Sequence, residues 1–531
     1  MDLDRALQEA LEALEQGPPR RVQASVQDVG RVLSVGDGIA HVEGLPTVML
    51  HELVTFEDGT RGEVLDLGEA RVGVAIYGAT EGIQAGSEVR RTGETIRVPV
   101  GSGVLGRVVD PLGQPVDEGR ALGTTERWEV RQLAPGPLDR QPVREPLLTG
   151  IKTIDTAAPI GRGQRMLLVG DRDTGKASSA MDAIISQGSE DVNCVYVSIG
   201  KKRSTVLNTV DELDRHDALD HTAVVFAPAD APASVRHLSA LTGCTIAEWF
   251  AWQGGHSLVV YDDLSRHAHA YRELSLLLRR SPGREAYPGD IFSVHAGLME
   301  RSFKLDDRHG GGSVTALPII ETQRGNITAF IPTNLISMTD GQLYFDAHLY
   351  AEGRRPAIDV GQSVSRVGED AQPGPLQKVA ARVRPELSQY EEVKGFTRFG
   401  AIIEESTKRQ IARGEQLLEI IQQEPREIVD LPIQVALLWT HQEDLLEDWP
   451  AEAVPGFEEA LEDQQEVVPG IAEELRSADT ITPEIEERLR DWVGASLEAA
   501  KPDELRDGEG TGAAGRGEAE DVTQGNAEDR A

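Results

Sequence analysis

The segment from Arg165 to Gln187 constrains the fold more than any other part of the chain. A short apolar run, Arg165 to Val169, leads into the loop Gly170-Asp-Arg-Asp-Thr-Gly-Lys-Ala177, and a helical pattern follows from Ser178 to Gln187. Glycines in such a loop let backbone N–H groups converge on an anion at a helix N-terminus, and the lysine adds a positive charge. The order of strand, loop and helix therefore predicts a phosphate-binding loop in an α/β domain.

The last position of this loop departs from the expected pattern. The pattern G-x-x-x-x-G-K-[ST] ends in a hydroxyl residue that can ligate Mg²⁺, whereas Ala177 has no hydroxyl. The loop is thus altered at its metal end, while Gly170, Gly175 and Lys176 keep the chemistry that binds phosphate. An ordinary glycine-rich turn is the alternative interpretation, and the apolar strand directly before the loop disfavours it.

Composition excludes several classes of protein. The chain has 531 residues, of which 39% are hydrophobic and 27% charged, and its apolar runs fall far short of the roughly 20 residues that a membrane span needs. The N-terminus shows no secretory signal, so we expect a cytosolic chain in which Cys194 and Cys244 are buried thiols. A formal net charge of −36 argues against a nucleic-acid partner, because phosphate backbones are bound by basic patches.

Changes of pattern along the chain predict its domains. Short β-branched runs separated by turn residues indicate a six-stranded antiparallel barrel, and alternating apolar runs and helical patterns indicate a parallel sheet covered on both faces. Helical patterns follow, one of them at Gln442 to Trp449. The predicted segments are an amphipathic helix at 1–20, the β-barrel at 22–98, a P-loop nucleotide-binding domain at 99–379, a helical bundle at 380–499 and a disordered acidic tail at 500–531.

Several stretches taken together resemble the alpha subunits of F-type ATP synthases. They include Gly161 to Lys176, Tyr261 to Ser265, Leu276 to Asp290, Gly311 to Gln323, Ile331 to Asn334 and Gly361 to Gly368. The resemblance covers roughly Gln23 to Trp439 and implies a barrel, a central α/β P-loop (RecA-like) domain and a helical bundle. The altered loop and the acidic tail suggest a divergent branch of the family.

The resemblance also implies partners and a location. Alpha chains of this family alternate with beta chains in a hexameric ring around a rotating gamma stalk, and catalysis occurs on the beta chains. It implies delta and b subunits of a peripheral stalk near the N-terminus, and a membrane contact only through the Fo sector. The chain is then expected at the cytoplasmic face of the bacterial cell membrane, in a complex that couples ATP synthesis or hydrolysis to ion transport.

Residue roles follow from the same resemblance. Arg366 matches the arginine finger that reaches the phosphates held by the neighbouring beta chain, and Ser363 matches a supporting residue. The chain's own site would hold ATP or ADP through the loop, Mg²⁺ through Asp262, and adenine through Arg355 and Pro356. The loop positions of that site are Gly170, Asp171, Arg172, Asp173, Thr174, Gly175, Lys176 and Ala177.

Three departures from the family fall at the metal end of this site. Alpha chains usually have glutamine at the position of Asp173, threonine or serine at the position of Ala177, and glutamine at the position of Lys201. Lys201 also falls where the beta chains carry the glutamate that orients the attacking water, and a protonated lysine cannot do that work. We therefore expect a catalytically silent site. Asp173 and Lys201 either pair across it, or turn to solvent and leave a site that still holds nucleotide.

Two other classes of function remain open from the sequence. A self-sufficient homohexameric P-loop ATPase, of the export or RNA-translocating type, could share the plan of a barrel and a P-loop domain, although Lys201 and Ala177 count against it. A nucleotide-free scaffold with no part in turnover is the other class. Turnover by the chain alone would favour the first, and an Arg366→Ala variant without effect would favour the second.

Overall fold

The computed structural model describes residues 28–117, 119, 121–123, 126–397, 404–502 and 505. The predicted N-terminal helix and nearly all of the predicted acidic tail lie outside the described residues. The chain divides into two compact units, one of residues up to Ile96 with Leu277–Arg279, and one of Arg97–Leu276 with the residues from Arg280 onwards. The domain boundaries expected at 98/99 and 379/380 stay predictions.

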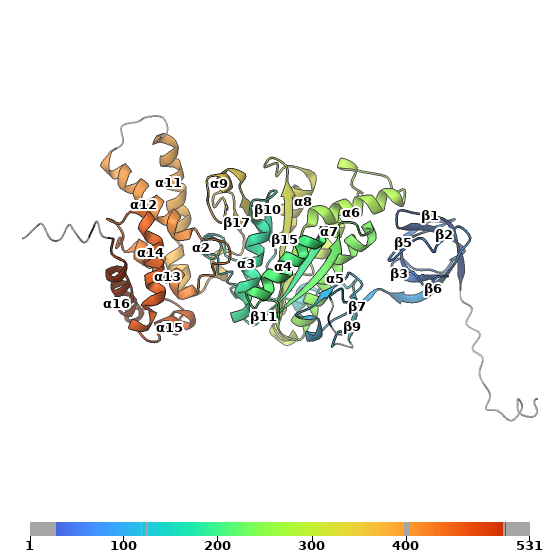
Figure 1. The fold of residues 1–531 in the computed structure, drawn as a ribbon, viewed down its shortest axis with the longest axis horizontal. Coiled ribbons are helices and arrows are strands. Elements are labelled where there is room, and N and C mark those ends of the chain that lie inside the picture. Colours follow the sequence, from blue (N-terminus) through green and yellow to red (C-terminus); the bar gives the residue numbers. More distant parts are fainter. Residues whose placement is uncertain are drawn as a thin grey trace, which may run out of the picture. The chain divides into compact units, whose positions relative to one another are not determined.

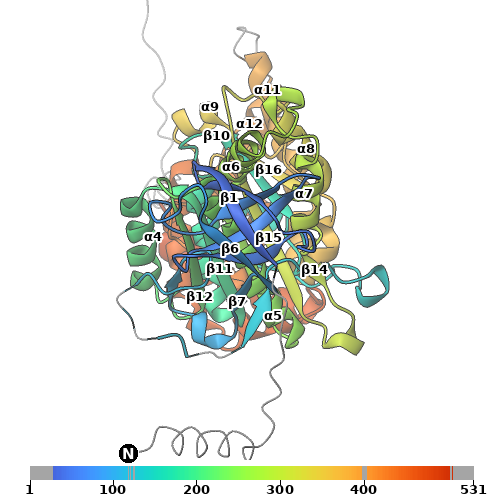
Figure 2. The ribbon, with the colours of Figure 1, turned by 90° about the vertical axis from the view of Figure 1, so that its right-hand side faces the viewer.

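The first unit is built on a closed barrel whose strand order is β1-β2-β5-β4-β3-β6. All neighbouring strands that pair are antiparallel. Figure 1 labels β1, β2, β3, β5 and β6 of this barrel, and Figure 2 labels β1 and β6. Alternating residues such as Val32, Val42, Val64 and Val74 fill the barrel core. The predicted six-stranded antiparallel barrel is confirmed, with strands β1 Val29–Gly36, β2 Ile39–Glu43, β3 Glu52–Phe56, β4 Arg61–Leu67, β5 Val72–Ile76 and β6 Glu88–Thr95.

The second unit contains a mostly parallel sheet of order β17-β16-β10-β15-β13-β11-β12-β8. Only β17 and β14, which pairs with β15, run antiparallel to their neighbours among the strands described. The strands are β8 Val108–Val109, β10 Met166–Asp171, β11 Val192–Lys201, β12 Thr222–Pro228, β13 His256–Asp262, β14 Phe303–Lys304, β15 Ser313–Thr322, β16 Gly341–Phe345 and β17 Val364–Ser365. A small separate sheet pairs β7 Arg97–Pro99 with β9 Arg127–Glu129.

Helices cover both faces of the large sheet, as the continuous apolar runs predict. In β10, Leu167 and Val169 belong to one hydrophobic core while Met166 and Leu168 belong to another, because successive side chains point to opposite faces. The first core is shared with α5 Ala233–Trp252, α6 Leu264–Leu277, α7 Ile291–Met299 and α8 Phe330–Met338. The second is shared with α2 Lys152–Ala157, α3 Lys176–Ser186 and α4 Arg203–Arg215 (Figure 1).

The C-terminal part is helical and has its own core. Apolar residues of its helices pack together with Ala157 of α2. The helices are α10 Gly374–Ala380, α11 Val383–Thr397, α12 Glu405–Ile421, α13 Leu431–Gln442, α14 Val454–Asp463, α15 Ile471–Ser477 and α16 Pro483–Ala500. The helical C-terminal region is thus confirmed, and α10 contributes to the same core.

One helical segment was predicted wrongly. The sequence favours a helix from Gln442 to Trp449, but α13 ends at Gln442 and a series of turns follows. Asp444 adopts a left-handed conformation with φ 56°, which ends the helical path. Leu446 and Trp449 are nevertheless buried. The apolar residues that are spaced as in a helix therefore belong to turns that pack on the core.

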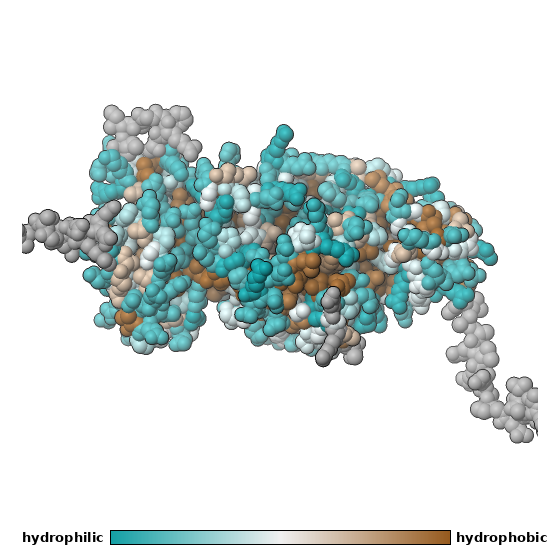
Figure 3. Space-filling view, in the orientation of Figure 1, coloured by the Kyte–Doolittle hydropathy of each residue, from teal (hydrophilic) through white to brown (hydrophobic). Residues whose placement is uncertain are grey.

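Figure 3 shows the hydropathy of one face of the molecule. Most of the face in Figure 3 is hydrophilic, and a patch of apolar residues interrupts it where Figure 1 labels α4 and α5. Among the described residues, no helix combines the length and the apolarity required to cross a bilayer. Cys194 and Cys244 are free, buried thiols as predicted, and burial raises the pKa of Cys244 to about 12.

Candidate functional site

The loop between β10 and α3 has the backbone that its glycines predict. A Cβ atom at Gly170 would lie 2.3 Å from the carbonyl oxygen of Phe345 in β16, so only glycine fits at this close approach. Gly175 has φ 97° and precedes the first residue of α3, where the chain turns into the helix. The N-cap residue Gly175 has no side chain with which to cap the N–H groups of this helix start. The predicted phosphate loop therefore has its N–H groups at the carboxyl edge of the sheet.

Lys176 is buried and held against the loop. Its Nζ donates hydrogen bonds to the carbonyl oxygens of Gly170, at 2.9 Å, and Asp171, and lies 3.3 Å from Oγ1 of Thr174. Burial lowers the pKa of Lys176 to about 8, while the carboxylates of Glu321 and other acids nearby act in the opposite direction. At neutral pH the side chain of Lys176 therefore keeps its positive charge.

The acidic loop residues have different surroundings. The carboxylate of Asp171 accepts hydrogen bonds from the Thr322 hydroxyl at 2.6 Å and from the Gly325 N–H at 2.8 Å, so it ties the loop to the end of β15. The side chain of Asp173 is 89% exposed and lies 3.6 Å from the guanidinium of Arg172, which is itself largely exposed. The carboxylate of Asp173 therefore faces solvent at the rim of the site.

Lys201 pairs with Asp262, which corrects the two alternatives weighed from the sequence. The Nζ atom of Lys201 lies 2.7 Å from Oδ1 of Asp262 and 3.8 Å from Oδ2 of Asp263. The other carboxylate oxygen of Asp262 accepts a hydrogen bond from the buried hydroxyl of Tyr196. The alternative in which Lys201 pairs with Asp173 is wrong, because Asp173 points to solvent and Asp262 stands at the end of the adjacent strand. The other alternative holds for Asp173, which is exposed, but not for Lys201.

These residues do not fit a Mg²⁺ ion as they are arranged. Ala177 offers no ligand, and both oxygens of Asp262 already accept hydrogen bonds, one of them from an ammonium group. Among the described residues, no cluster of three His, Cys, Asp or Glu side chains could hold a metal ion. Asp262, the residue expected to ligate Mg²⁺, is instead paired with the Lys201 ammonium in this structure.

A cavity of about 300 Å³ lies at the phosphate loop. Its lining includes the loop residues from Asp173 to Ser178 together with Lys201, Asp262, Glu321 and Tyr350. Two basic side chains, Lys176 and Lys201, therefore meet the loop N–H groups in one cavity. This arrangement can hold the phosphates of a ligand by charge and by hydrogen bonds.

The side expected to hold adenine is much narrower. Arg355 and Pro356 line a cavity of only about 30 Å³ beside Gly175 and Gln423. Both ends of the Gln423 side-chain amide are already hydrogen-bonded within the protein. Its Nε2 donates to the carbonyl of Gly150 at 2.7 Å, and its Oε1 accepts from the N–H of Lys152 at 2.9 Å. The space is about that of a single water molecule, although the predicted residues do lie next to the loop.

Arg426 fastens the neighbouring segment over α3. Its guanidinium forms an ion pair with Asp182, lies 2.7 Å from Oε1 of Glu212 and donates to the hydroxyl of Ser178 at 3.1 Å. Sequence analysis missed Arg426, as it missed Tyr196. The only signal that the sequence offered is an arginine after the Gln-Gln-Glu-Pro425 stretch, within reach of a helix that carries Asp182.

Arg366 lies on a short, firmly anchored segment at the edge of the sheet. Its backbone N–H donates to the carbonyl of Asp340 at 2.8 Å, and the hydroxyl of the preceding Ser365 donates to the carbonyl of Pro159 at 2.7 Å. The side chain of Arg366 is exposed, and its guanidinium has no hydrogen-bond or ion-pair partner in the part of the chain that the structure describes. The backbone of Arg366 is thus fixed, while its guanidinium is exposed and unpaired among the described residues.

Ser363 is buried behind this segment. Its hydroxyl donates to the carbonyl of Asp359 at 2.6 Å and accepts from the N–H of Tyr344 in β16 at 3.0 Å. The carbonyl of Ser363 also accepts from the guanidinium of Arg384 at 2.9 Å. Ser363 therefore positions the strand that leads to Arg366 and does not share its exposed surface.

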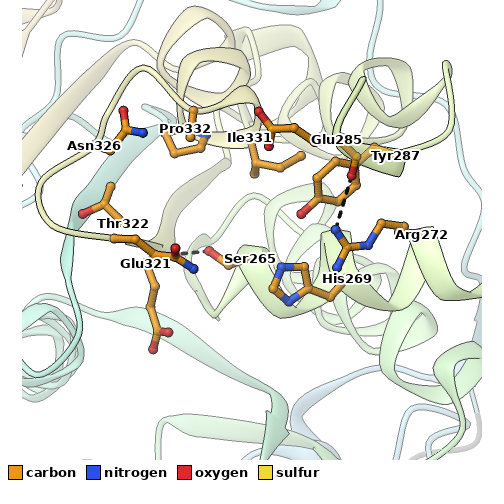
Figure 4. A pocket seen from close by; sticks show the side chains of 12 residues that line it. Ser265, His269, Arg272, Glu285, Tyr287, Glu321, Thr322, Asn326, Ile331 and Pro332 are labelled. Carbon is orange, nitrogen blue, oxygen red and sulfur yellow. Dashed lines mark hydrogen bonds between the residues drawn. The ribbon is translucent and has the colours of Figure 1, made fainter. Parts of the chain in front are cut away.

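A larger cavity of about 450 Å³ adjoins the same edge of the sheet. Glu321 lines it and also lines the cavity at the phosphate loop. Figure 4 shows Thr322, Asn326 and Pro332 on one side of it and His269 and Arg272 on the other. Sequence analysis did not predict this cavity, since its walls come from α6, the 284–287 turn and the loop after β15.

Comparisons with known proteins agree with this geometry. Residues 25–93 match the beta-barrel domain of the ATP synthase alpha/beta family, residues 150–365 match its nucleotide-binding domain, and residues 372–495 match the C terminal domain of the ATP synthase alpha/beta chain. The chain is 48% identical over 455 residues to the ATP synthase subunit alpha of Aquifex aeolicus (strain VF5), a match that covers 86% of this chain and 90% of that protein. The chain therefore belongs to the ATP synthase alpha/beta family, as an alpha subunit of the F1 type.

Proposed function

We propose that this alpha subunit alternates with beta chains around a gamma stalk and supplies Arg366 to the phosphates bound by the neighbouring beta chain. The observation that carries the proposal is the exposed guanidinium of Arg366, which has no partner among the described residues, on a backbone fixed to Asp340 and Pro159. A planar, permanently charged fork can contact two phosphate oxygens as charge develops in the transition state. Such a group is effective only if its position is fixed.

The chain's own phosphate loop is proposed to bind ligand without turnover. Hydrolysis requires a group that orients or deprotonates the attacking water near the terminal phosphate. Lys201 occupies the expected position, and its ammonium is paired with Asp262 at 2.7 Å. ATP or ADP with Mg²⁺ would therefore be processed only at the partner's site, and the residues from Gly170 to Ala177 would form a non-catalytic site.

The same proposal gives the chain its place in a larger assembly. Delta and b subunits would meet its N-terminal segment, and ion transport would be carried by the membrane sector, at the cytoplasmic face of a bacterial membrane. A homohexameric ATPase is not supported, because the family match and the 48% identity point to an alpha subunit.

Turnover by the assembled ring tests the role of Arg366. The variant R366A in a ring with beta and gamma chains is expected to hydrolyse ATP about 10³-fold more slowly or worse, within the range seen for arginine fingers. The control is R382A, which removes another exposed arginine of the same unit. Turnover within about twofold of wild type in R366A would contradict the proposal, and so would ATP turnover by the purified chain alone.

A further inference from the structure

We propose that Lys201 takes the place of the divalent cation at the chain's own phosphate loop, so that this site binds a di- or triphosphate chain free of metal. The inference rests on the proposed assignment of residues 170–177 as a nucleotide site. It goes beyond that assignment, since it names the ionic form of the ligand and the side chain that selects it.

The first argument is the occupation of Asp262. A carboxylate at the end of the strand β13 could ligate a metal through either oxygen, but one oxygen accepts from the Lys201 ammonium at 2.7 Å and the other from the Tyr196 hydroxyl. A divalent cation at this carboxylate would lie next to the ammonium, with a strong repulsion in so buried a place. Asp262 is only 3% exposed.

The second argument is the fixed position of Lys201. The parallel register pairs Ser198 with Asp262, and the ladder to β12 shifts between Ile199 and Lys201, where Gly200 has φ 64°. This irregularity ends β11 beside the carboxylate, so that Lys201 reaches it over a short distance. An ammonium has three donors, and Asp262 accepts one of them at 2.7 Å. Lys201 also lines the cavity at the loop, where its other donors can meet phosphate oxygens.

The third argument is the charge of the ligand. A magnesium-bound polyphosphate brings two positive charges of its own, which would face Lys201. A metal-free polyphosphate brings only negative charges, which Lys176 and Lys201 in the lining attract. Of the acids in the same lining, Asp262 is paired with Lys201 and Asp173 is exposed, so Glu321 is the carboxylate that opposes this attraction. The substitution of a hydroxyl residue by Ala177 is then of no consequence, because no metal remains to be ligated.

The two cavities also separate the phosphates from the base. The loop has about 300 Å³ of space, while the side lined by Arg355 and Pro356 has about 30 Å³. The shared chemistry of the ligand is therefore the polyphosphate chain, which can come from a nucleotide or from inorganic tripolyphosphate. The affinities for ATP and for tripolyphosphate distinguish these two sources.

Calorimetric titration of the purified full-length chain tests the inference. ATP, ADP and tripolyphosphate are each added in excess EDTA and in millimolar Mg²⁺. The wild-type chain is expected to bind the metal-free forms at least as tightly as the Mg²⁺ forms. K201Q is expected to weaken metal-free binding about ten- to a hundredfold, the loss of one hydrogen bond to a charged group. K202Q, which changes the exposed neighbouring lysine, is expected to leave binding unchanged.

A double variant guards against loss of folding. K201Q leaves Asp262 buried without its cation, so K201Q/D262N removes both charges together, and thermal unfolding confirms that each variant is folded. Both are expected to bind metal-free polyphosphate weakly.

Equal affinity for ATP and tripolyphosphate would identify an anion site that ignores the base, and tighter binding of ATP would show that the narrow side opens. Either result supports a metal-free site.

Two results would overturn the inference. The first is wild-type binding that Mg²⁺ strengthens tenfold or more, and the second is unchanged metal-free binding in K201Q. If the wild-type chain bound none of the ligands with or without metal, the assignment of the loop as a nucleotide site would itself fail. The role of Arg366 is tested separately by ring turnover, so the two failures are distinguishable.

Discussion

The ammonium of Lys201 lies 2.7 Å from Oδ1 of Asp262, where the adjacent parallel strands β11 and β13 end. This pair occupies the metal end of a phosphate loop that has also lost its hydroxyl residue at Ala177. The two changes belong together, because a hydroxyl ligand has no use once a lysine holds the carboxylate. In the function proposed above, the loop keeps the residues that bind phosphate and lacks those that would bind metal.

Restoring the hydroxyl alone is predicted to be insufficient. A177T places a hydroxyl at the start of α3, but Lys201 still neutralises Asp262, so Mg²⁺ should change the affinity for ATP by less than about threefold. The double variant A177T/K201Q frees the carboxylate and should bind ATP about tenfold or more tightly with Mg²⁺ than with EDTA. Calorimetry measures both. A strong Mg²⁺ effect in A177T alone would show that Lys201 does not block the metal.

Substitutions of Ser363 and of Arg366 are predicted to have different effects on stability and on turnover. S363A removes the acceptor of the Tyr344 N–H inside the protein, which should lower the free energy of unfolding by about 1–3 kcal/mol. R366A removes an exposed side chain and should leave stability unchanged while ring turnover collapses. Thermal unfolding and turnover, measured on both variants, separate the two roles. A large loss of stability in R366A would show that its guanidinium has a structural partner.

The buried ion pair between Arg301 and Glu248 should matter greatly for stability. Nε of Arg301 lies 2.7 Å from Oε1 of Glu248, and both side chains are almost fully buried. R301M leaves the glutamate without its partner and should cost about 3–5 kcal/mol in the free energy of unfolding.

The exposed pair Arg97–Glu129 provides the matched control, and R97A should cost about 1 kcal/mol or less. Urea unfolding followed by tryptophan fluorescence compares the two, since Trp249 and Trp252 lie on the same helix as Glu248. Equal losses in R301M and R97A would contradict the prediction.

Acid should destabilise the nucleotide domain through two buried histidines. Burial lowers the pKa of His267 to about 4 and of His295 to about 3, from an ordinary value of 6.5. The unfolded chain therefore binds protons below pH 6.5 that the folded chain refuses, so stability present above pH 6.5 is lost as pH falls towards 4, by up to about 1.4 kcal/mol per pH unit for each histidine.

Thermal unfolding between pH 7 and 4.5 measures this loss. H295L removes one of the two groups and should make the decline shallower, whereas H216Q changes an exposed histidine and should leave its slope unchanged. The same slope in H295L and wild type would contradict the assignment.

The sequence predicts the fold well because the signals for each element are local. Strands such as Met166–Asp171 are continuous apolar runs, and their burial on both faces requires helices on both sides. The wrongly predicted helix after Gln442 shows the limit, since the spacing of Leu446 and Trp449 satisfies a helix and a buried turn equally.

The contacts between the candidate site residues could not be predicted from the sequence. Lys201 and Asp262 were both singled out, yet the partner of Lys201 depends on the register of β11 against β13, which residue types alone do not give. The same holds for Tyr196, which reaches Asp262 across that register, and for Arg426, which reaches α3 from a distant segment. The exposure of Asp173 also depends on the loop conformation, where its φ is 60°.

In the proposed ring, metal chemistry belongs to the partner's site, while this chain contributes Arg366 and a metal-free loop. Paramagnetic resonance of the ring loaded with ATP and with Mn²⁺ in place of Mg²⁺ counts the bound metal directly. We expect one Mn²⁺ for each alpha–beta pair in the wild-type ring, and a second in rings that carry A177T/K201Q. Two Mn²⁺ ions per pair in the wild-type ring would contradict the claim.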